Sequence, residues 1–390
     1  MKIALLMGNR FSPWHLEPFK RLPGDHALVC FRAESEIQRH FQQRDDGRLD
    51  LPVERVYFDY QAGPLPMRLW NLLTMRYAGR EPRLLPFHER LRGFDLIQTW
   101  ELFTDWTREA LTARERFGTP VSIMVWDNIP FNMEQTPERR AIKQRALAEA
   151  DQFLVYTERS RRMLLLEGAP AEKIVQIPPG IDTELFSPAP RDRAALGLPE
   201  DAFVMLFVGW LLPRKGIDFL LFALRELLDD PDLRDKKIHL AIVGSGPGRD
   251  RVDALIKRLN VGHACTFIGP TPYGQMPAIF RAADVFALPS IATPEWQEQF
   301  AMSLIEAMAC GIPCIATHSG AIPEILGDAG VLIQPNDFFS VTAAVKEMIE
   351  KPALRTSLSH TAQTRAAMCF AIEAQTEGLQ MSYATLITHE

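Results

Sequence analysis

Glu298 and Glu306 have the side-chain type and the spacing to bind a polar ligand. Seven residues separate them, and the run predicts a loop that brings Glu298 to a helix start, with Glu306 about two turns further along. Gly311 and Pro313 would end that helix. N–H groups at a helix start donate to phosphate oxygens, and carboxylates accept hydrogen bonds from sugar hydroxyls. Alternatively, Glu298 only stabilises the helix start and Glu306 faces solvent.

Two adjacent cations could complete a phosphate site. Arg214 and Lys215 follow an apolar strand expected at Val204–Val208 and precede Gly216. Their charges, next to the backbone donors of a helix start, suit a diphosphate group. A solvated turn is the alternative interpretation, so the importance of the pair depends on its position in the fold.

A glycine-rich run follows the next expected strand. Gly244 and Gly246 permit a tight turn and a close approach of the backbone to a ligand. The run is a poor dinucleotide-binding fingerprint, because Arg249 stands in the place of the third glycine and no acid follows at the required distance. The pattern therefore disfavours a dehydrogenase, and glycines that serve only the turn remain an alternative.

In the front half, Asp127 follows the apolar strand expected at Val121–Val125. We expect its carboxylate to orient a donor or acceptor hydroxyl, with capping of its own loop as the alternative. The neighbouring Trp126 can stack on a sugar face or pack into the core.

Short apolar runs alternate with amphipathic stretches along the whole chain, which predicts an α/β fold with two doubly wound parallel sheets. The front-half strands are predicted at Ile3–Met7, Leu28–Phe31, Arg55–Phe58, Leu96–Thr99, Val121–Val125, Phe153–Tyr156 and Ile174–Ile177. The back-half strands are predicted at Val204–Val208, His239–Val243, Thr266–Ile268, Val285–Leu288, Pro313–Ala316 and Val331–Ile333.

The proline-rich segment Ile177–Pro188 is the predicted link between two domains. The first domain covers residues 1–182 and the second covers residues 183–370. A last helix, residues 371–390, is expected to pack back on the first domain. Two such domains would face a central cleft, since ligands bind beyond the carboxyl ends of parallel strands.

Composition excludes several classes of protein. The chain has 390 residues, of which 47% are hydrophobic and 24% charged, and its net charge of −6 does not suit a nucleic-acid binder. Its five cysteines are scattered, so no zinc site is predicted. No apolar run approaches the ~18 residues of a membrane span. The N-terminus lacks a signal peptide's features, so we expect a cytoplasmic protein.

Four segments of the back half, in order and at consistent separations, resemble the family 4 retaining glycosyltransferases, which have the two-domain Rossmann-like GT-B fold. They are the linker phrase at 176–186, the Val-Gly…Arg-Lys-Gly run at 208–216, the glycine turn at 243–247, and the paired-glutamate signature that ends at Pro313.

The resemblance implies a nucleoside-diphosphate sugar donor held mainly by the back-half domain, without a metal or a cofactor. Lys215 and Arg214 would neutralise the diphosphate, Glu298 would face the donor sugar, and Glu306 would bind the ribose. Glu298, Lys215 and Asp127 are the predicted catalytic residues. The remaining predicted donor-binding residues are Gly209, Gly244, Gly246, Gln299, Phe300, Ala301 and Met302.

The chain departs from the family pattern in both halves. Trp210 stands where many members place an arginine, and Ala301 replaces a commoner glycine. Trp126-Asp127-Asn128 stands where members often carry His-Asp or His-Glu, and the glycine-rich first loop is reduced to Gly8–Ser12. The predicted acceptor-side residues are Asn9, Arg10, Trp126 and Asn128.

One segment could contact an anionic membrane. Residues 65–94 combine aromatic and aliphatic residues with six arginines: Arg68, Arg76, Arg80, Arg83, Arg90 and Arg92. A basic, amphipathic stretch of this kind can lie in a lipid surface. The alternative is a packed helix followed by a solvated arginine-rich loop.

The predicted enzyme transfers a sugar with retention of configuration to a glycan, glycolipid or other hydroxyl acceptor, in bacterial polysaccharide or glycolipid assembly. Two alternatives stay open. One is a sugar-nucleotide-binding scaffold that has lost catalysis, which Trp210 and the shortened first loop suggest. The other is a nucleotide-sugar epimerase.

Overall fold

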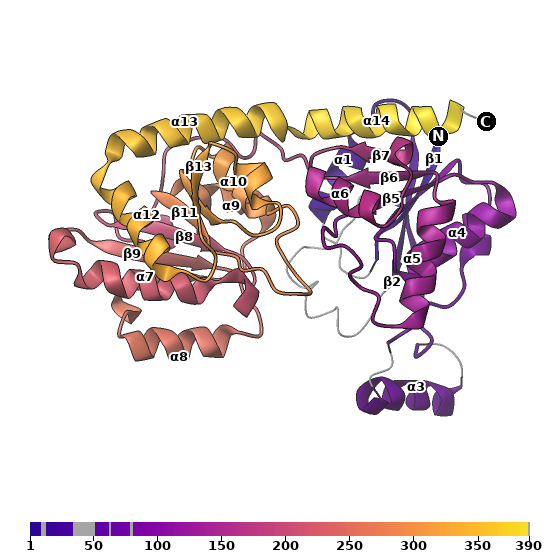
Figure 1. Ribbon diagram of the computed structural model, residues 1–390, viewed down its shortest axis with the longest axis horizontal. Helices are drawn as coiled ribbons and strands as arrows, with labels where there is room; N and C mark the ends of the chain where they lie inside the picture. The colour runs from indigo at the N-terminus through magenta and orange to yellow at the C-terminus, as the bar shows by residue number, and fades with distance from the viewer. Residues whose placement is uncertain (9–12, 34–50, 62–63, 79–80, 389–390) are drawn as a thin grey trace. The chain divides into compact units, whose positions relative to one another are not determined.

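The computed structural model describes residues 1–8, 13–33, 51–61, 64–78 and 81–388 of the chain. The chain divides into two compact units (Figure 1). Unit 1 comprises Met1–Ile177 with Gln375–Glu390, and unit 2 comprises Pro178–Ala374. The predicted Asn9 and Arg10 lie outside the described residues.

Unit 1 contains one parallel sheet, with seven strands in the described part of the chain. The order is β3-β2-β1-β4-β5-β6-β7. The strands are β1 (Lys2–Leu6), β2 (Ala27–Ala33), β3 (Val53–Val56), β4 (Leu96–Trp100), β5 (Val121–Val125), β6 (Gln152–Val155) and β7 (Ile174–Gln176).

Unit 2 repeats this order with six strands among its described residues, β10-β9-β8-β11-β12-β13. They are β8 (Phe203–Val208), β9 (Ile238–Val243), β10 (Cys265–Ile268), β11 (Val285–Leu288), β12 (Cys314–Thr317) and β13 (Gly330–Ile333). The predicted doubly wound α/β architecture is confirmed. The strand order reverses between β1 and β4 in unit 1 and between β8 and β11 in unit 2. This position is the switch point of the sheet, where such folds bind ligands.

Helices cover both faces of each sheet, because the connections between parallel strands cross over them. The helices of unit 1 are α1 (Glu17–Lys20), α3 (Leu65–Ala78), α4 (Asp105–Phe117), α5 (Pro137–Glu149) and α6 (Glu158–Leu166), joined by α14 (Ile372–Thr388). Those of unit 2 are α7 (Ile217–Asp229), α8 (Arg249–Leu259), α9 (Met276–Arg281), α10 (Met302–Ala309), α11 (Ile322–Leu326), α12 (Phe338–Glu350) and α13 (Pro352–Cys369).

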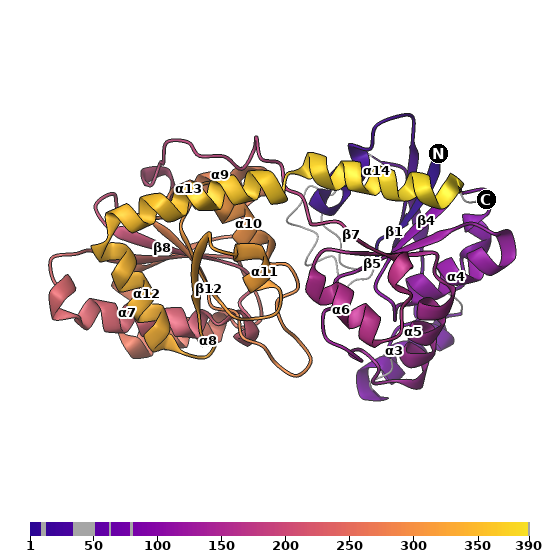
Figure 2. The ribbon, with the colours of Figure 1, turned by 45° about the horizontal axis from the view of Figure 1, so that its top comes forward.

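The strands of unit 2 alternate their side chains between two separate cores. Met205 and Phe207 of β8 pack with α7 and α12 on one face, and Val204 and Leu206 pack with α9, α10 and α11 on the other. Figure 2 shows β8 and β12 between these groups of helices. The sheet is thus buried on both faces, which leaves its strand ends to carry function.

The C-terminal helix α14 completes the core of unit 1. Leu379 and Tyr383 are fully buried against Ile3 and Leu5 of β1. The Tyr383 hydroxyl lies 2.7 Å from Oε1 of Gln98, a buried residue of β4. A segment far away in the sequence therefore supplies one wall of this core. No helix in the described ranges is long and apolar enough to cross a bilayer.

Arg193 links the segment before β8 to the loop before β11. Its side chain is 1% exposed. The guanidinium donates to the carbonyls of Ala282 at 2.8 Å and Ala202 at 2.7 Å, and it pairs with Asp284 at 2.6 Å. A buried cation with this many partners is stable only while its counter-ion remains.

We therefore expect Arg193→Met to lower the free energy of unfolding by about 3–5 kcal/mol, because the substitution leaves Asp284 without its buried partner. Arg191 is the matched control, since it pairs with the same carboxylate at 3.1 Å but is half exposed. Arg191→Met should cost less than about 1 kcal/mol. Urea denaturation followed by circular dichroism measures both, and equal losses would contradict this assignment.

Candidate functional site

The ends of β8 and β11 bring Lys215 and Glu298 together at the switch point of the unit 2 sheet. Lys215 lies on a short 3-10 helix, η5 (Pro213–Lys215), and Glu298 lies in the loop before α10. The Lys215 Nζ atom is 2.9 Å from both carboxylate oxygens of Glu298. Glu298 is 5% exposed, so this ion pair is largely shielded from water.

Two serines and a backbone amide hold Glu298 in place. Ser290, two residues after β11, donates its hydroxyl to Oε2 of Glu298 at 2.7 Å. The N–H of Glu298 donates to the Ser319 hydroxyl at 3.4 Å, and its carbonyl accepts from the N–H of Ala321 at 2.9 Å. Loops that follow β8, β11 and β12 therefore converge on one residue, Glu298.

Two glycines allow these loops to approach so closely. A Cβ atom at Gly216 would lie 1.9 Å from the carbonyl oxygen of Pro289, and one at Gly320 would lie 1.9 Å from that of Glu298. Both glycines also have positive φ, +71° and +55°, which side chains disfavour. Larger residues at these positions would separate the loops and displace Glu298 from Lys215.

Arg214 lies beside the ion pair. Its guanidinium is 4.5 Å from the centroid of the Trp296 ring, and Lys215 is 5.0 Å from the same ring. The carbonyl of Arg214 accepts a hydrogen bond from the N–H of Ile291 at 2.9 Å. Trp210, which stands where many members of the family have an arginine, is 42% exposed.

The predicted glycines hold two neighbouring loops against each other. A Cβ at Gly244 would lie 2.0 Å from the carbonyl oxygen of Gly209, and one at Gly246 would lie 2.9 Å from the N atom of Leu211. The N–H of Leu211 donates to the carbonyl of Ser245 at 3.0 Å. These close approaches account for the glycines within the protein, and their contact with a ligand stays a prediction.

The predicted backbone donors Gln299, Phe300, Ala301 and Met302 lead into α10. Ala301, at the N-cap, adopts a left-handed conformation with φ of 47° and offers no side-chain cap. This conformation explains why a glycine would suit the position. The first N–H groups of a helix have no partners within it, so this start can donate to an anion.

Glu306 is 7% exposed in the middle of α10, which shows the alternative of a solvent-facing acid to be wrong. Burial raises the pKa of its carboxyl to about 7, while a hydrogen bond from Tyr273 opposes the shift. Such a carboxyl can accept hydrogen bonds from a diol that enters this part of the molecule.

In unit 1, Asp127 ends up in the loop after β5. Its carboxylate accepts hydrogen bonds from the N–H groups of Asn128 at 2.8 Å and Ile129 at 3.2 Å, and from the Asn132 side chain at 2.9 Å. This is the loop-capping geometry. Asn128 is buried, and a role of either residue toward a hydroxyl stays a prediction.

Trp126 and Glu101 lie at the same edge of the unit 1 sheet. The Trp126 ring stacks on His15 at 5.1 Å between centroids, and the backbone N–H of Trp126 donates to Oε1 of Glu101 at 3.1 Å. Burial, and secondarily the charge of Asp127, raises the pKa of Glu101 to about 8. Glu101 also has a positive φ of 62°, a strained conformation that is common at functional sites.

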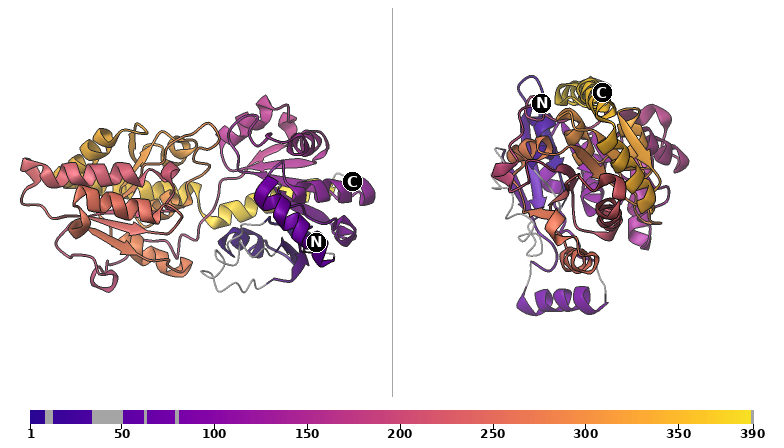
Figure 3. Two further views of the ribbon diagram at one scale, coloured as in Figure 1. Left: turned by 90° about the horizontal axis from the view of Figure 1, so that it is seen from below. Right: turned by 90° about the vertical axis from the view of Figure 1, so that its left-hand side faces the viewer.

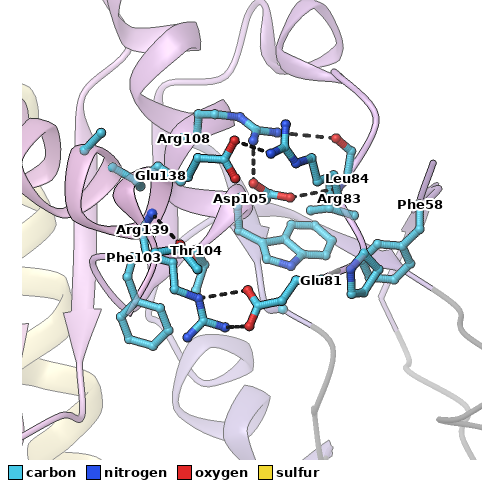
Figure 4. A pocket seen from close by; sticks show the side chains of 16 residues that line it. Phe58, Glu81, Arg83, Leu84, Phe103, Thr104, Asp105, Arg108, Glu138 and Arg139 are labelled. Carbon is cyan, nitrogen blue, oxygen red and sulfur yellow. Dashed lines mark hydrogen bonds and ion pairs between the residues drawn. The ribbon is translucent and has the colours of Figure 1, made fainter. Parts of the chain in front are cut away.

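A cavity of about 890 Å³ lies at the switch point of unit 1, between Gly8 after β1 and the starts of α4 and α5. Figure 4 shows charged pairs in its lining together with the aromatic side chains of Phe58 and Phe103. Arg139 binds Glu81 through two hydrogen bonds of 2.9 and 2.6 Å, and Arg108 pairs with Asp105. The apolar lining includes Phe58, Leu84, Phe103, Trp106 and Ile142.

Sequence reasoning missed Ser290, Trp296, Ser319 and Glu101. Glu101 directly follows β4 and Ser290 lies two residues after β11, so a search of all strand ends for polar residues would have found both. Ser319 lies two residues after β12 and would have been found by the same search. Trp296 gave no signal, because its role depends on loops that meet only in the fold. Within the described residues, no group of three or more His, Cys, Asp or Glu side chains could hold a metal ion.

Both halves of the chain match known protein families. Residues 28–185 match the family described as Glycosyltransferase Family 4, and residues 188–365 match Glycosyl transferases group 1. A D-inositol 3-phosphate glycosyltransferase of Actinosynnema mirum is 32% identical, over 70% of this chain and 68% of its own length. The enzyme of that name from Kineococcus radiotolerans is 33% identical, over 59% of this chain and 56% of its own length.

Solved structures share the fold. The sucrose-phosphate synthase of Thermosynechococcus elongatus matches with a TM-score of 0.74 at 22% identity, over the full length of both chains. HepE of Anabaena, in complex with UDP, matches with a TM-score of 0.73 at 19% identity, over 99% of this chain and 100% of its own.

The buried carboxyl of Glu306 should make stability depend on pH. Its pKa is about 7 in the folded chain and 4.5 as the ordinary value, so the folded state binds the proton more tightly. Its contribution to stability is present below pH 4.5 and is lost as the pH rises through 7, by up to ~3 kcal/mol. Glu306→Gln should therefore raise the free energy of unfolding at pH 8 and leave it little changed at pH 5.

Urea denaturation at pH 5, 6, 7 and 8 measures this effect. Glu226→Gln is the control, because Glu226 is exposed on α7 in the same unit and should leave the pH profile unchanged. If the Glu306→Gln and wild-type profiles ran parallel from pH 5 to pH 8, another group would be responsible.

Proposed function

The chain belongs to glycosyltransferase family 4, and we propose that it transfers a sugar from a nucleoside-diphosphate sugar to a hydroxyl acceptor with retention of configuration. The observation that carries this proposal is the Lys215–Glu298 pair at the switch point of unit 2. The cation of this pair suits a phosphate group, and the carboxylate can accept hydrogen bonds from sugar hydroxyls.

The two charges would serve different parts of one donor. Lys215, with Arg214 next to it, neutralises the diphosphate, and the N–H groups at the start of α10 donate to phosphate or sugar oxygens. Glu298 accepts hydrogen bonds from hydroxyls of the transferred sugar, while Glu306 accepts them from the ribose. Lys215 and Glu298 pair with each other, so a diphosphate that binds Lys215 would replace part of this interaction.

In the proposed reaction the bond between the anomeric carbon and the diphosphate oxygen breaks, and the acceptor hydroxyl oxygen bonds to that carbon on the same face. The acceptor proton passes to an oxygen of the departing diphosphate. Lys215 stabilises the negative charge that develops on this leaving group. No carboxylate nucleophile, metal ion or cofactor takes part in this proposal.

A nucleotide donor is supported by HepE, whose structure contains UDP. The acceptor would bind to unit 1, where the cavity next to Gly8 offers an apolar floor and polar walls. The named relatives act on an inositol phosphate. We propose a glycan, glycolipid or other hydroxyl acceptor, used in bacterial polysaccharide or glycolipid assembly in the cytoplasm, with peripheral contact to the inner membrane face.

A sugar-nucleotide-binding protein without catalysis is the second candidate, because Trp210 replaces a commonly basic residue. Arg214 lies close to Lys215 and Trp296, so the site retains a guanidinium. Turnover separates the candidates: a transferase slowly hydrolyses its donor without an acceptor, an epimerase interconverts sugars, and an inactive binder forms no product.

We expect one of UDP, GDP or ADP, or one of their sugars, to raise the melting temperature of the purified protein, because a ligand that binds only the folded state stabilises it. The stabilising donor should then be hydrolysed slowly when no acceptor is present. Stabilisation without any product would support the inactive binder, and the absence of any shift would contradict the proposed donor site.

Glu298→Gln should reduce transfer and donor hydrolysis by about two orders of magnitude or more, as for other groups that stabilise a transition state. Gln retains a polar side chain of the same size, so the fold should persist. Progress curves with the donor found above measure this effect, and wild-type rates in this variant would exclude Glu298 from the reaction.

Lys215→Ala should weaken binding of the nucleoside diphosphate by about 1.5–3 kcal/mol, because it removes a charged hydrogen-bond partner. Lys257→Ala is the matched control, since Lys257 is an exposed lysine on α8 of the same unit. Isothermal titration calorimetry with the nucleotide compares the two variants. Equal affinities would remove Lys215 from the diphosphate site.

A further inference from the structure

Helix α3 exposes large apolar side chains. Leu65, Trp70 and Met67 are 66%, 67% and 56% exposed, and Leu69 and Leu73 are about half exposed. Figures 1 and 3 show α3 standing off from the rest of unit 1. Isolated exposed apolar residues are common, but a contiguous group on one helix marks a surface that another body covers.

Two polar side chains of α3 bind backbone carbonyls of the segment that precedes the helix. Asn71 donates its side-chain N–H to the carbonyl of Asp59 at 3.1 Å, and Arg68 donates to that of Tyr60 at 3.4 Å. With about 3.6 residues per turn, Leu65, Leu69 and Leu73 form a row on the other side of the helix. A helix packed on a globular core buries its apolar side, whereas this leucine row of α3 is exposed.

The charge of this segment indicates what covers it. Residues 60–80 contain three arginines, Arg68, Arg76 and Arg80, and no Asp or Glu. A net positive charge beside leucine, methionine and tryptophan suits the boundary between the headgroups and acyl chains of an anionic bilayer. Tryptophan is enriched at that depth.

The other arginines of the predicted membrane segment have partners within the protein. Arg83 pairs with Glu138, Arg90 with Glu54, and Arg92 with Glu89. These three arginines therefore form the solvated, ion-paired part of residues 65–94. The candidate membrane-binding segment is then the helix Leu65–Ala78 alone.

We propose that α3 is an interfacial membrane helix whose exposed row, Leu65, Leu69, Leu73 and the adjacent Trp70, inserts into the surface of an anionic bilayer. The insertion brings unit 1 to the membrane, where an acceptor carried by a lipid would be within reach. Only this use of the contact rests on the proposed function; the binding of α3 to lipid does not.

Flotation with vesicles of phosphatidylglycerol and phosphatidylcholine tests the proposal. The wild-type protein should float with these vesicles, less so with phosphatidylcholine alone, and less at high salt. The double variant Leu69→Ser/Trp70→Ser should bind at least about tenfold more weakly, because it removes two inserted side chains. Leu166→Ser is the matched control, since Leu166 on α6 is also 67% exposed but lies outside α3.

Tryptophan fluorescence tests the depth of insertion. Vesicles should shift the wild-type emission to shorter wavelength, and Trp70→Phe should remove most of that shift while binding persists, because phenylalanine also inserts. Failure of the wild-type protein to float would overturn the proposal, as would a double variant that binds as well as the Leu166→Ser control.

A second copy of the chain is the other candidate occupant. If the wild-type protein forms a dimer without vesicles, and the α3 double variant is a monomer, the surface is a self-association interface and the proposal fails. Donor hydrolysis without vesicles should be equal in the wild-type protein and the double variant. Vesicle binding without any turnover would leave the membrane inference standing and contradict the proposed function.

Discussion

An ammonium and a carboxylate that are both withdrawn from water remain stable only if the surrounding structure supplies their hydrogen bonds. Lys215 and Glu298 meet this requirement because loops after three strands converge on them. Ser290 donates to the carboxylate, and the Ser319–Ala321 segment binds the backbone of Glu298. The parallel sheet order brings the three strand ends to one edge, so the architecture of unit 2 is what makes the pair possible.

The same strand order produces different chemistry in the two units. At the switch point of unit 2 the strand ends carry the cations Arg214 and Lys215 beside Glu298. At that of unit 1 they carry Glu101 and Asp127, and the pKa of Glu101 is raised by burial and by its acidic neighbour. One edge therefore carries two cations beside a carboxylate, while the other carries two carboxyl groups. In the proposed function, the first edge binds the diphosphate of the donor and the second lies on the acceptor side.

Much of the fold follows from the sequence, because buried parallel strands appear as short apolar runs between amphipathic helices. Thus Val121–Val125 and Val285–Leu288 were predicted with their observed bounds. Other contacts could not be predicted from the sequence. Nothing near Trp296 indicates that Arg214 will lie over its ring, and nothing near Arg90 indicates its pairing with Glu54. The sequence also left open whether α3 packs on the protein or exposes its leucine row. Hydrophobic periodicity identifies the apolar side of a helix but not the direction in which that side faces.

The return of the chain to unit 1 through α14 has a consequence for biosynthesis. Pro178–Ala374 leaves the ribosome before Leu379 and Tyr383 do, so the residues of unit 2 are all present while unit 1 still lacks these two side chains. Until then the Ile3 and Leu5 side of β1 lacks the part of its cover that α14 supplies, and Gln98 has no tyrosine hydroxyl to bond with. Although domains generally fold first at the N-terminal end during synthesis, here the N-terminal unit is the last to close its core. The nascent chain therefore exposes an apolar sheet face through most of its translation, the kind of surface that chaperones recognise.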